Sequence, residues 1–592
     1  MEQAFCSKTF VFQRLLLLLV EVVIVLGSDA ERNKPNFVIF LADDLGIGDI
    51  GCFGNDTIRT PAIDSISEEG AKLKHNLAAA ATCTPSRAAF LTGRYPIRSG
   101  MASNVEPGLL TMITTSDCTA GLPQNETTFA EILKGVGYST ALIGKWHLGT
   151  NLMTRNDHHF HPLKQGFDYF YGFLVTNIND CGDDGKRLFA TVYGNYIKSR
   201  CLWSVGYLVI LCTLRMLGLI RRRTVFLIWS CILVSVAWTY VRHVLLAGRI
   251  MCVLMKNYDV IEQPLILDTI STRMVNQANA FIERSAAHGP FLLYFSFLQT
   301  HTALFNMKNF TGSSKHGKYG DNVEEMDWMV GKVLSKLSEL GFEENTFVYF
   351  TSDHGGFKNE IAVLPHRIGE REGGWNGIYK GGKAQNWEGG IRVPTVVRYP
   401  PMIPRGIEIS VPTSTMDVFP TIASLAGVDL PRDRVIDGRD LMPLLRGKSA
   451  APPHDFLFHY CGQWLTAATC TVCGEDDMVY KVHYNTANLA PGTDHCTDPM
   501  VCPCTGDQTT FHEPPLVFNL VTDPSESNAL AATDRATENI VSRVDDAILK
   551  HKKTVLPVPV QISAERLQAN LLLAPCCNFP LCSCKEEYYD LD

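Results

Sequence analysis

The chain has 592 residues, 46% of them hydrophobic, and a formal net charge of −8 at pH 7. This length allows a large buried core and about two to four domains. The acidic balance gives no global support to a nucleic-acid-binding surface, so no nucleic-acid partner is expected.

Residues 1–30 have the pattern of a secretory signal peptide. Arg14 precedes the apolar run 15–26, and the small residues Gly27, Ser28 and Ala30 offer cleavage positions. Residue 31 onward is therefore expected to enter the secretory pathway, where glycans and disulfides form. The candidate glycosylation acceptors, each in an N-x-[ST] sequon, are Asn55, Asn125 and Asn309.

Four apolar runs of strand length each end at polar residues of catalytic type. They are 36–41 with Asp43 and Asp44, 139–143 with Lys145 and His147, 291–298 with His301, and 346–350 with Asp353 and His354. Helix-like patterns lie between them, at 128–137 and 322–340. Strands that alternate with helices indicate a largely parallel sheet covered on both faces, with ligands beyond the carboxyl ends of its strands. We therefore expect these polar side chains to share one crevice.

The acidic residues at these strand ends suggest a metal site. Asp43, Asp44 and Asp353 supply three carboxylates, and His354 supplies an imidazole. Each acidic pair alone is more simply explained as a turn or a helix cap. Gathered at one edge of a sheet, hard oxygen ligands favour Ca²⁺ or Mg²⁺ over zinc.

The segment 83–94 places a cysteine at the start of a predicted short helix. Pro85 suits the first helical turn, and Gly93 suits the exit from the helix. A helix N-terminus concentrates unpaired N–H donors, so it favours an anion next to Cys83. A thiolate nucleophile is one interpretation, and a buried structural cysteine is the alternative.

Residues 201–243 are predicted to form a transmembrane helical hairpin. Two apolar runs, 202–220 and 225–241, flank three arginines, and each approaches the roughly 20 residues that a membrane-spanning helix needs. Positive charge in the short loop favours the cytoplasmic side, which leaves both flanks in the lumen. The lipid bilayer is therefore an expected partner through residues 202–241. A pair of buried core helices is the alternative.

Two further segments carry chemical signals. The glycine-rich, basic stretch 376–394 can bring Lys380 or Lys383 close to an oxyanion. Ten of the 19 cysteines follow residue 460, which indicates a disulfide-stapled C-terminal region in an oxidising compartment. Cys470 and Cys473 have zinc-ligand spacing, but a signal-bearing chain favours a disulfide.

Two signatures carry a resemblance to a known family. Residues 83–94 match C-x-P-S-R-x-x-x-L-T-G-R at every fixed position, and residues 137–145 match G-Y-x-[ST]-x-x-x-G-K. Both resemble the signatures of the sulfatase family. Other stretches, among them 319–328 and 437–445, resemble the branch of steroid sulfatases and membrane-associated arylsulfatases. The resemblance extends over roughly residues 35–585.

The resemblance implies the fold class. It is an α/β, alkaline-phosphatase-like sulfatase fold with a large, mixed, mostly parallel sheet flanked by helices, a smaller C-terminal α+β subdomain and an inserted two-helix transmembrane hairpin. The implied domains are a signal peptide (1–30), the first part of the catalytic domain (31–200), the hairpin (201–243), the second part of the catalytic domain (244–450) and a cysteine-rich C-terminal subdomain (451–592).

The resemblance also implies the chemistry. The formylglycine-generating enzyme converts Cys83 to 3-oxoalanine (formylglycine), whose hydrate attacks the sulfur of a sulfate monoester. A covalent sulfo-enzyme intermediate forms, and the second hydroxyl then expels sulfate. One Ca²⁺ per site is implied, with ligands Asp43, Asp44, Cys83, Asp353 and His354.

The resemblance also implies roles for the basic residues of the site. Arg87 and Lys145 hold the hydrate, and His147 serves the elimination. Substrate contacts come from Lys145, His301 and Lys383, and Lys383 or His301 protonates the leaving alcohol. Two positions depart from the family pattern. Steroid sulfatases carry glutamine at the position of His354, although histidine is known there among other relatives, and relatives usually carry a second histidine at the position of Gln299.

The favoured substrate is a steroid sulfate, because a hairpin near a bilayer suits an apolar ester. The expected location is the endoplasmic reticulum membrane, with a lumenal catalytic domain. Three alternatives remain: an arylsulfatase for another lumenal aryl or glycan sulfate, a phosphomonoesterase of the same superfamily, and a catalytically silent membrane glycoprotein.

Overall fold

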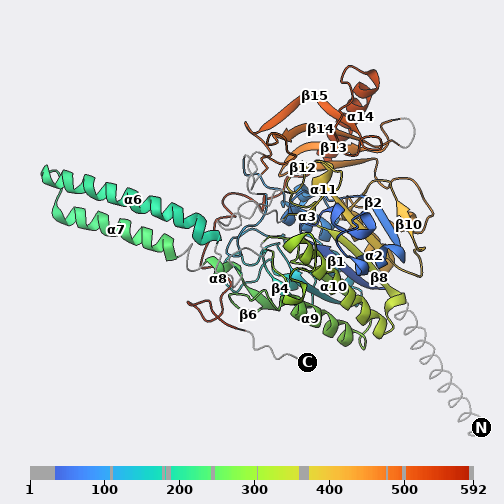
Figure 1. Cartoon of the computed structure of the whole chain (residues 1–592), viewed down its shortest axis with the longest axis horizontal. Helices are drawn as coiled ribbons and strands as arrows, with labels where there is room; N and C mark the ends of the chain where they lie inside the picture. The colour runs from blue at the N-terminus through green and yellow to red at the C-terminus, as the bar shows by residue number, and fades with distance from the viewer. Residues whose placement is uncertain are drawn as a thin grey trace, which may run out of the picture.

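The computed structural model describes residues 34–106, 111–176, 181, 188–241, 247–302, 304–358, 373–474, 478–496 and 502–585. The predicted signal peptide lies outside these residues. Figure 1 shows a large α/β body, a smaller domain above it, and a helical hairpin that projects from one side.

The body is built on one large mixed sheet. Within the described residues its eleven strands are β1 (Asn36–Ala42), β2 (Ala71–Leu77), β3 (Ser139–Lys145), β4 (Tyr169–Phe173), β5 (Leu254–Lys256), β6 (Asp259–Glu262), β7 (Phe291–Ser296), β8 (Thr346–Ser352), β9 (Arg392–Arg398), β10 (Ile407–Ile409) and β11 (Thr413–Ser414). Their order is β10-β2-β9-β8-β1-β7-β3-β4-β5-β6, and β11 pairs with β2. The central strands β8, β1, β7, β3 and β4 are parallel. The predicted mixed, mostly parallel sheet is confirmed.

The central strands form because their residues are apolar on both faces. Every residue of β1 and of β8 is buried, and alternate side chains of a strand point to opposite faces, so both faces are covered. Phe40 of β1 lies opposite Phe295 of β7 and Phe350 of β8. This register aligns the carboxyl ends of the three strands.

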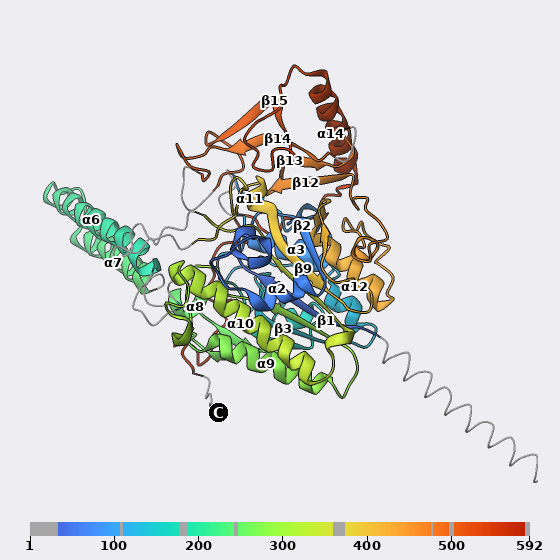
Figure 2. The same cartoon turned by 45° about the vertical axis from the view of Figure 1, so that its right-hand side comes forward.

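Helices cover the sheet in two groups. Helices α2 (Pro61–Glu68), α9 (Ile270–Ser285) and α10 (Gly317–Glu339) pack together, with α9 and α10 side by side in both views of the fold (Figures 1 and 2). Helices α3 (Cys83–Thr92), α5 (Phe129–Lys134) and α12 (Val418–Ala426) form the second group. Short helices are α4 (Pro96–Ser99), α8 (Ala247–Met251), α11 (Glu388–Ile391) and α13 (Met442–Leu445).

The smaller domain follows the body in sequence. It has an antiparallel sheet of β12 (Phe456–Cys461), β13 (Trp464–Cys470), β14 (Tyr480–Ala487) and β15 (Thr509–Asn519), against which α14 (Arg535–Thr554) packs. The predicted disulfide stapling is confirmed. The pairs are Cys461–Cys504, Cys470–Cys473, Cys496–Cys502, Cys576–Cys582 and Cys577–Cys584. Cys470 and Cys473 thus bond to each other rather than to zinc.

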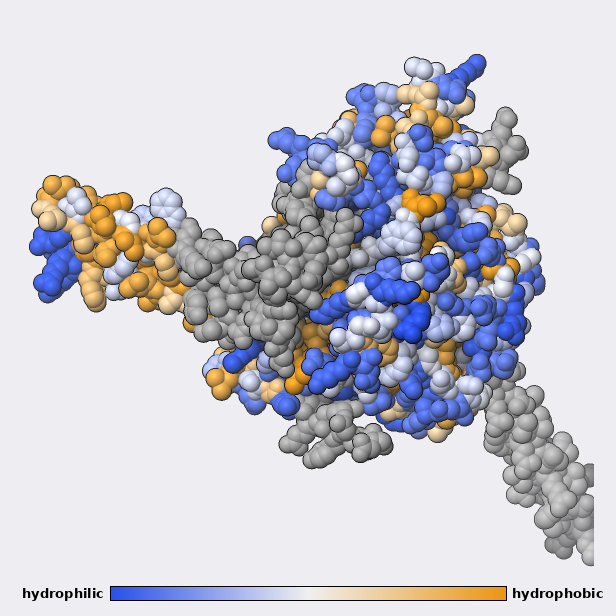
Figure 3. Space-filling view, viewed as in Figure 1, coloured by the Kyte–Doolittle hydropathy of each residue, from blue (hydrophilic) through white to orange (hydrophobic). Residues whose placement is uncertain are grey.

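The hairpin consists of α6 (Leu188–Met216) and α7 (Arg222–Tyr240). A disulfide, Cys181–Cys252, ties together the two flanks of this insertion. Most apolar side chains between Leu202 and Trp238 are exposed, which excludes the alternative of buried core helices, and Figure 3 shows a mostly hydrophobic projection. The prediction that the hairpin crosses a membrane needs correction: in the part of the chain that the structure describes, no helix is long and apolar enough to span one. The helices include Arg215, Arg222 and Arg223, which shorten their uncharged stretches.

A buried histidine makes the body sensitive to acid. His161 is fully buried, its ring centre lies 5.1 Å from that of Phe170, and its Nδ1 accepts the Leu163 N–H. Burial, and next the nearby His158, lower the pKa of His161 to about 3. Because the unfolded chain binds this proton near pH 6.5 and the folded chain does not, stability falls as the pH falls below 6.5.

We predict that His161→Asn reduces this acid sensitivity. Asparagine keeps an acceptor for Leu163 at the helix cap but does not titrate. Between pH 7 and pH 5 the variant should lose about 1–2 kcal/mol less free energy of unfolding than the parent. Urea unfolding of both proteins at the two pH values measures the difference, and an equal loss in both would contradict it.

Candidate active site

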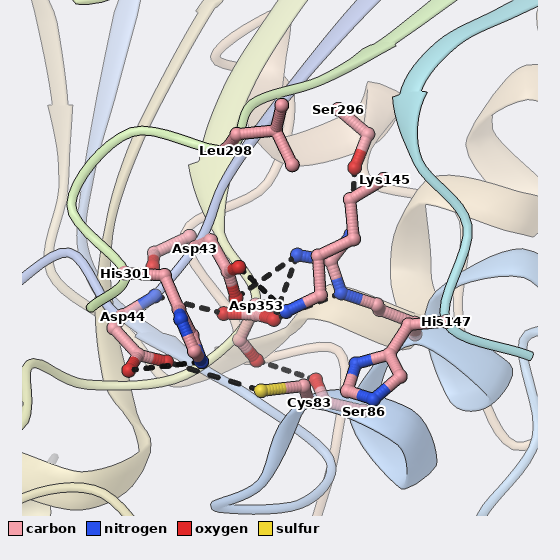
Figure 4. Close-up of polar contacts among 12 residues, drawn as sticks. Asp43, Asp44, Cys83, Ser86, Lys145, His147, Ser296, Leu298, His301 and Asp353 are labelled. Carbon is pink, nitrogen blue, oxygen red and sulfur yellow. Dashed lines mark hydrogen bonds and ion pairs between the residues drawn. The ribbon is translucent and has the colours of Figure 1, made fainter. Parts of the chain in front are cut away.

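The carboxyl ends of four central strands and the start of α3 meet in one place. Asp43 and Asp44 follow β1, His301 follows β7, and Asp353 follows β8. Figure 4 shows these side chains converging with Lys145 from the end of β3, with Cys83 beside them. The candidate residues are all buried: Asp43, Asp44, Cys83, Arg87, Lys145, His147, His301, Asp353, His354 and Lys383.

The predicted helix at the signature begins at Cys83 itself. Gly93 ends it in the left-handed conformation, with a φ of 66°, which glycine adopts without strain. The thiol Sγ lies 3.3 Å from Nε2 of His354 and 3.9 Å from Oδ1 of Asp44. Burial raises the pKa of the Cys83 thiol, but Lys145 and Lys383 outweigh it and leave the pKa below its usual value.

Cations surround the carboxylates. Lys145 Nζ donates to Asp43 Oδ2 at 2.5 Å, and Arg87 Nε donates to Asp353 Oδ2 at 3.0 Å. Burial would raise the pKa of Asp43, but Lys145 and other nearby cations hold it well below its usual range. Asp43 is therefore a carboxylate at neutral pH.

The glycine-rich loop contributes one of its two candidate lysines. Lys383 Nζ donates to Asp44 Oδ2 at 2.5 Å. Lys380 Nζ instead lies 3.8 Å from the centre of the Trp387 ring, in a cation–π contact. Of the two, Lys383 is the lysine that contacts a carboxylate of the site.

His147 is held as a neutral imidazole of one tautomer. Its Nε2–H donates to the Ile113 carbonyl at 2.7 Å, so Nδ1 carries the lone pair. Thr84 completes a ring of bonds, because its hydroxyl donates to the His147 carbonyl and accepts the Ile113 N–H. Burial, followed by Lys145, lowers the pKa of His147 well below its usual value. Its Nδ1 is buried without a hydrogen-bond partner among the described residues.

His301 faces the same carboxylates from β7. Its Nε2 lies 4.0 Å from Asp44 Oδ2, and its Nδ1–H donates to the Thr302 carbonyl. Burial and then Lys383 lower the pKa of His301 to about 3. The imidazole is therefore neutral here.

The donor set suits a hard divalent cation. One ligand atom from each of Asp43, Asp44, Cys83 and His354 lies within 4.8 Å of the others. Asp43 Oδ1 is buried and accepts no hydrogen bond in the described residues, although Arg87 Nη2 lies 3.2 Å away. Asp353 Oδ1 lies 3.6 Å from His354 Nε2. Carboxylate oxygens, one of them short of a hydrogen-bond donor, are the type of ligand that Ca²⁺ takes.

His354 shows how strongly these anions attract positive charge. Burial would lower its pKa, but Asp353, Cys83 and Asp44 raise it to about 9. A divalent cation bound by the same groups would take the place of that proton.

Two serines outside the predicted set of site residues hold this arrangement. Ser86 Oγ donates to the Asp353 carbonyl, and Ser296 Oγ accepts from Arg87 Nη1 at 2.6 Å. Ser86 is a fixed position of the 83–94 signature, so the motif contained a signal for it. Ser296 has no such signal apart from its place at the end of β7.

Comparisons with known proteins agree with this geometry. The family model "Sulfatase" matches residues 35–428, and "C-terminal region of aryl-sulfatase" matches residues 452–584. Human arylsulfatase D is 46% identical, and human steryl-sulfatase is 45% identical; the alignments cover 94% of this chain and 93% and 95% of those proteins. The PsFucS1 sulfatase structure from Pseudoalteromonas sp. is similar in fold, with a TM-score of 0.66, 24% identity, and coverage of 90% of this chain and 94% of that one.

We predict that Ca²⁺ stabilises the protein through Asp44. At a free concentration 100 times its Kd, a ligand adds about 2.7 kcal/mol to the free energy of unfolding. After EDTA treatment, added Ca²⁺ should raise the melting temperature of the parent protein but not that of Asp44→Asn. Asp417→Asn is the control, because that buried carboxylate pairs with His454 instead. Equal stabilisation of Asp44→Asn would contradict the site.

Proposed function

Since the chain belongs to the sulfatase family and is a sulfate ester hydrolase, we propose that it hydrolyses steroid sulfates, with Cys83 as the precursor of its nucleophile. The observation that carries the proposal is the position of Cys83 at the start of α3, 3.3 Å from His354 and among three cations and three carboxylates.

The charge balance supports a bound metal and an anionic substrate. Arg87, Lys145 and Lys383 balance Asp43, Asp44 and Asp353. One Ca²⁺, held by the three aspartates, His354 and the side chain at position 83, would polarise the sulfate oxygens. It would also leave an excess of positive charge that attracts the sulfate ester.

Oxidation of Cys83 to formylglycine explains why cysteine stands at this position. The hydrated aldehyde supplies one hydroxyl to attack sulfur and a second that allows sulfate to leave. Arg87 and Lys145 are proposed to hold the hydrated side chain at position 83 by their positive charges. Lys383 is proposed to bind the sulfate group opposite Asp44.

His147, His301 and Lys383 are the residues proposed to transfer protons. His147 presents the Nδ1 lone pair of a neutral imidazole, as a base that takes a proton during elimination must. Lys383 and His301 both lie next to Asp44, and one of them is proposed to protonate the leaving alcohol. Lys383 carries protons on Nζ, whereas His301, which is neutral with its N–H on Nδ1, must first take up a proton at Nε2.

We predict that Cys83→Ser abolishes turnover. Serine cannot be oxidised to the aldehyde by the same route and offers one hydroxyl, so a sulfated enzyme would have no group with which to expel sulfate. The steady-state rate with an aryl sulfate should fall by roughly 10³-fold or more. Cys118→Ser, at another buried free cysteine, is the matched control and should remain active. Sustained turnover by Cys83→Ser would reject the mechanism.

An apolar substrate and a membrane location fit the hairpin. Leu202, Trp203, Val234 and Trp238 are each more than half exposed. Apolar side chains gathered on one projection favour contact with lipid, where steroid sulfates accumulate. Disulfides in both domains suit the oxidising lumen of the secretory pathway. We therefore propose that the protein is located at the endoplasmic reticulum membrane.

Two of the three sequons can carry glycans without rearrangement. Asn125 and Asn309 are exposed. Asn55 is buried, and its amide donates to the Gly48 carbonyl and accepts from Thr57 and Ile58. Glycosylation is therefore proposed for Asn125 and Asn309.

We predict that membranes of cells that produce the protein hydrolyse estrone sulfate as well as a soluble aryl sulfate. The activity should sediment with the membranes, because the exposed hairpin contacts lipid. Membranes of the same cells with Cys83→Ser are the control. Cleavage of the aryl sulfate alone would reject the steroid assignment in favour of an arylsulfatase, and activity confined to the supernatant would reject lipid contact.

A further inference from the structure

Helix α10 carries an acidic run, 319–328, that the proposed reaction does not use. Its side chains hold segments that precede the helix in the chain. Asp321 accepts the N–H groups of Gly312 and Ser314, Glu324 pairs with Arg59, and Asp327 accepts the N–H groups of Ala62 and Ile63 at the start of α2. Among the contacts of these four carboxylates with described residues, those of Glu325 reach the loop that carries His301.

Glu325 contacts both ends of that loop, residues 298–307. Its Oε2 accepts the Met307 N–H at 2.7 Å, and its Oε1 lies 3.4 Å from Gln299 Nε2. Ser271 of α9 joins the same group, since its hydroxyl donates to Glu325 and accepts from Gln299 Nε2 at 2.8 Å. Glu325, Gln299 and Ser271 are all fully buried, so water does not compete for these bonds.

The turn between Gln299 and His301 needs such support. Thr300 has a φ of 72°, a left-handed conformation that costs a β-branched residue roughly 1–3 kcal/mol. Its hydroxyl donates to the Asp43 carbonyl at 2.5 Å. Glu325 thus holds Gln299, the residue before the turn, and the Asp43 carbonyl holds Thr300 in the turn itself. His301 follows directly, 4.0 Å from Asp44.

We propose that Glu325 is a positioning residue for His301, acting through Gln299 and the Met307 amide. The proposal rests on the function proposed for His301 in the sulfatase reaction. It also gives Gln299 a role at the position where relatives carry a second histidine: its amide donates to Ser271 and Glu325 and so ties the loop to α9 and α10.

A double-mutant cycle tests whether Glu325 acts through His301. Glu325→Ala and His301→Asn should each lower kcat/KM, Glu325→Ala by roughly 10- to 100-fold, the range expected when a reacting group is displaced by about 1 Å. The double variant should be no worse than His301→Asn alone, because coupled residues are not additive. Gln299→Met keeps the size of the side chain but removes its hydrogen-bond donor. It should lower kcat/KM less than Glu325→Ala does, and its loss should likewise not add to that of His301→Asn.

Leaving-group dependence separates positioning from general damage. For a series of aryl sulfates with leaving phenols of increasing pKa, the losses in Glu325→Ala should follow the pattern of His301→Asn. Asp327→Asn is the matched control: it removes a buried carboxylate of α10 that holds α2, so any loss should be equal for all leaving groups and additive with His301→Asn.

The outcomes are distinguishable. The positioning role would be overturned if the losses in kcat/KM of Glu325→Ala and Gln299→Met added fully to that of His301→Asn. Losses that were uniform across leaving groups would overturn it as well. If Glu325→Ala does not fold, Gln299→Met decides by the same criteria. Full activity of His301→Asn would overturn both the role of His301 and this inference, whereas the Cys83→Ser result would still stand for the reaction itself.

Discussion

The site depends on the balance between buried carboxylates and the cations around them. Asp43, Asp44 and Asp353 lie at the ends of neighbouring parallel strands, where they would repel one another without Arg87, Lys145 and Lys383. Burial makes each pair strong, and it also makes the loss of a single partner costly. The same balance explains the raised pKa of His354, because the carboxylates attract any positive charge that can reach them.

The parallel register of the central strands brings the charged residues of the site together. Ala42 of β1 pairs with Ser352 of β8, and Leu41 pairs with Ser296 of β7, so the residues that follow these strands emerge side by side. Helix α3 then brings its N-terminus and Cys83 to the carboxylates, with Ser86 bonded to the Asp353 carbonyl. The loop that carries His301 is tied to α10 through Glu325. The sheet, α3 and α10 thus each fix one part of the site.

Much of this was predictable from local patterns. The apolar runs that end at Asp43, Lys145 and Asp353 predict strands and their shared edge, and the signature predicts a helix that begins at Cys83. The ring that joins Thr84, Ile113 and His147 was not predictable, because it uses backbone groups and a hydroxyl without a sequence pattern. The choice between Lys380 and Lys383 depends on the path of a loop. The hairpin was predicted as two helices, but its arginines lie within the helices that were expected to span a membrane.

The proposed reaction requires that Cys83 be oxidised and that the oxidised side chain be the nucleophile. Mass spectrometry of the peptide that contains Cys83, on preparations made with and without the formylglycine-generating enzyme, measures the oxidised fraction directly. Specific activity towards a sulfate ester should rise in proportion to the fraction of 3-oxoalanine at position 83 and approach zero where the thiol is intact. A fully active preparation with an unmodified Cys83 thiol would contradict the claim.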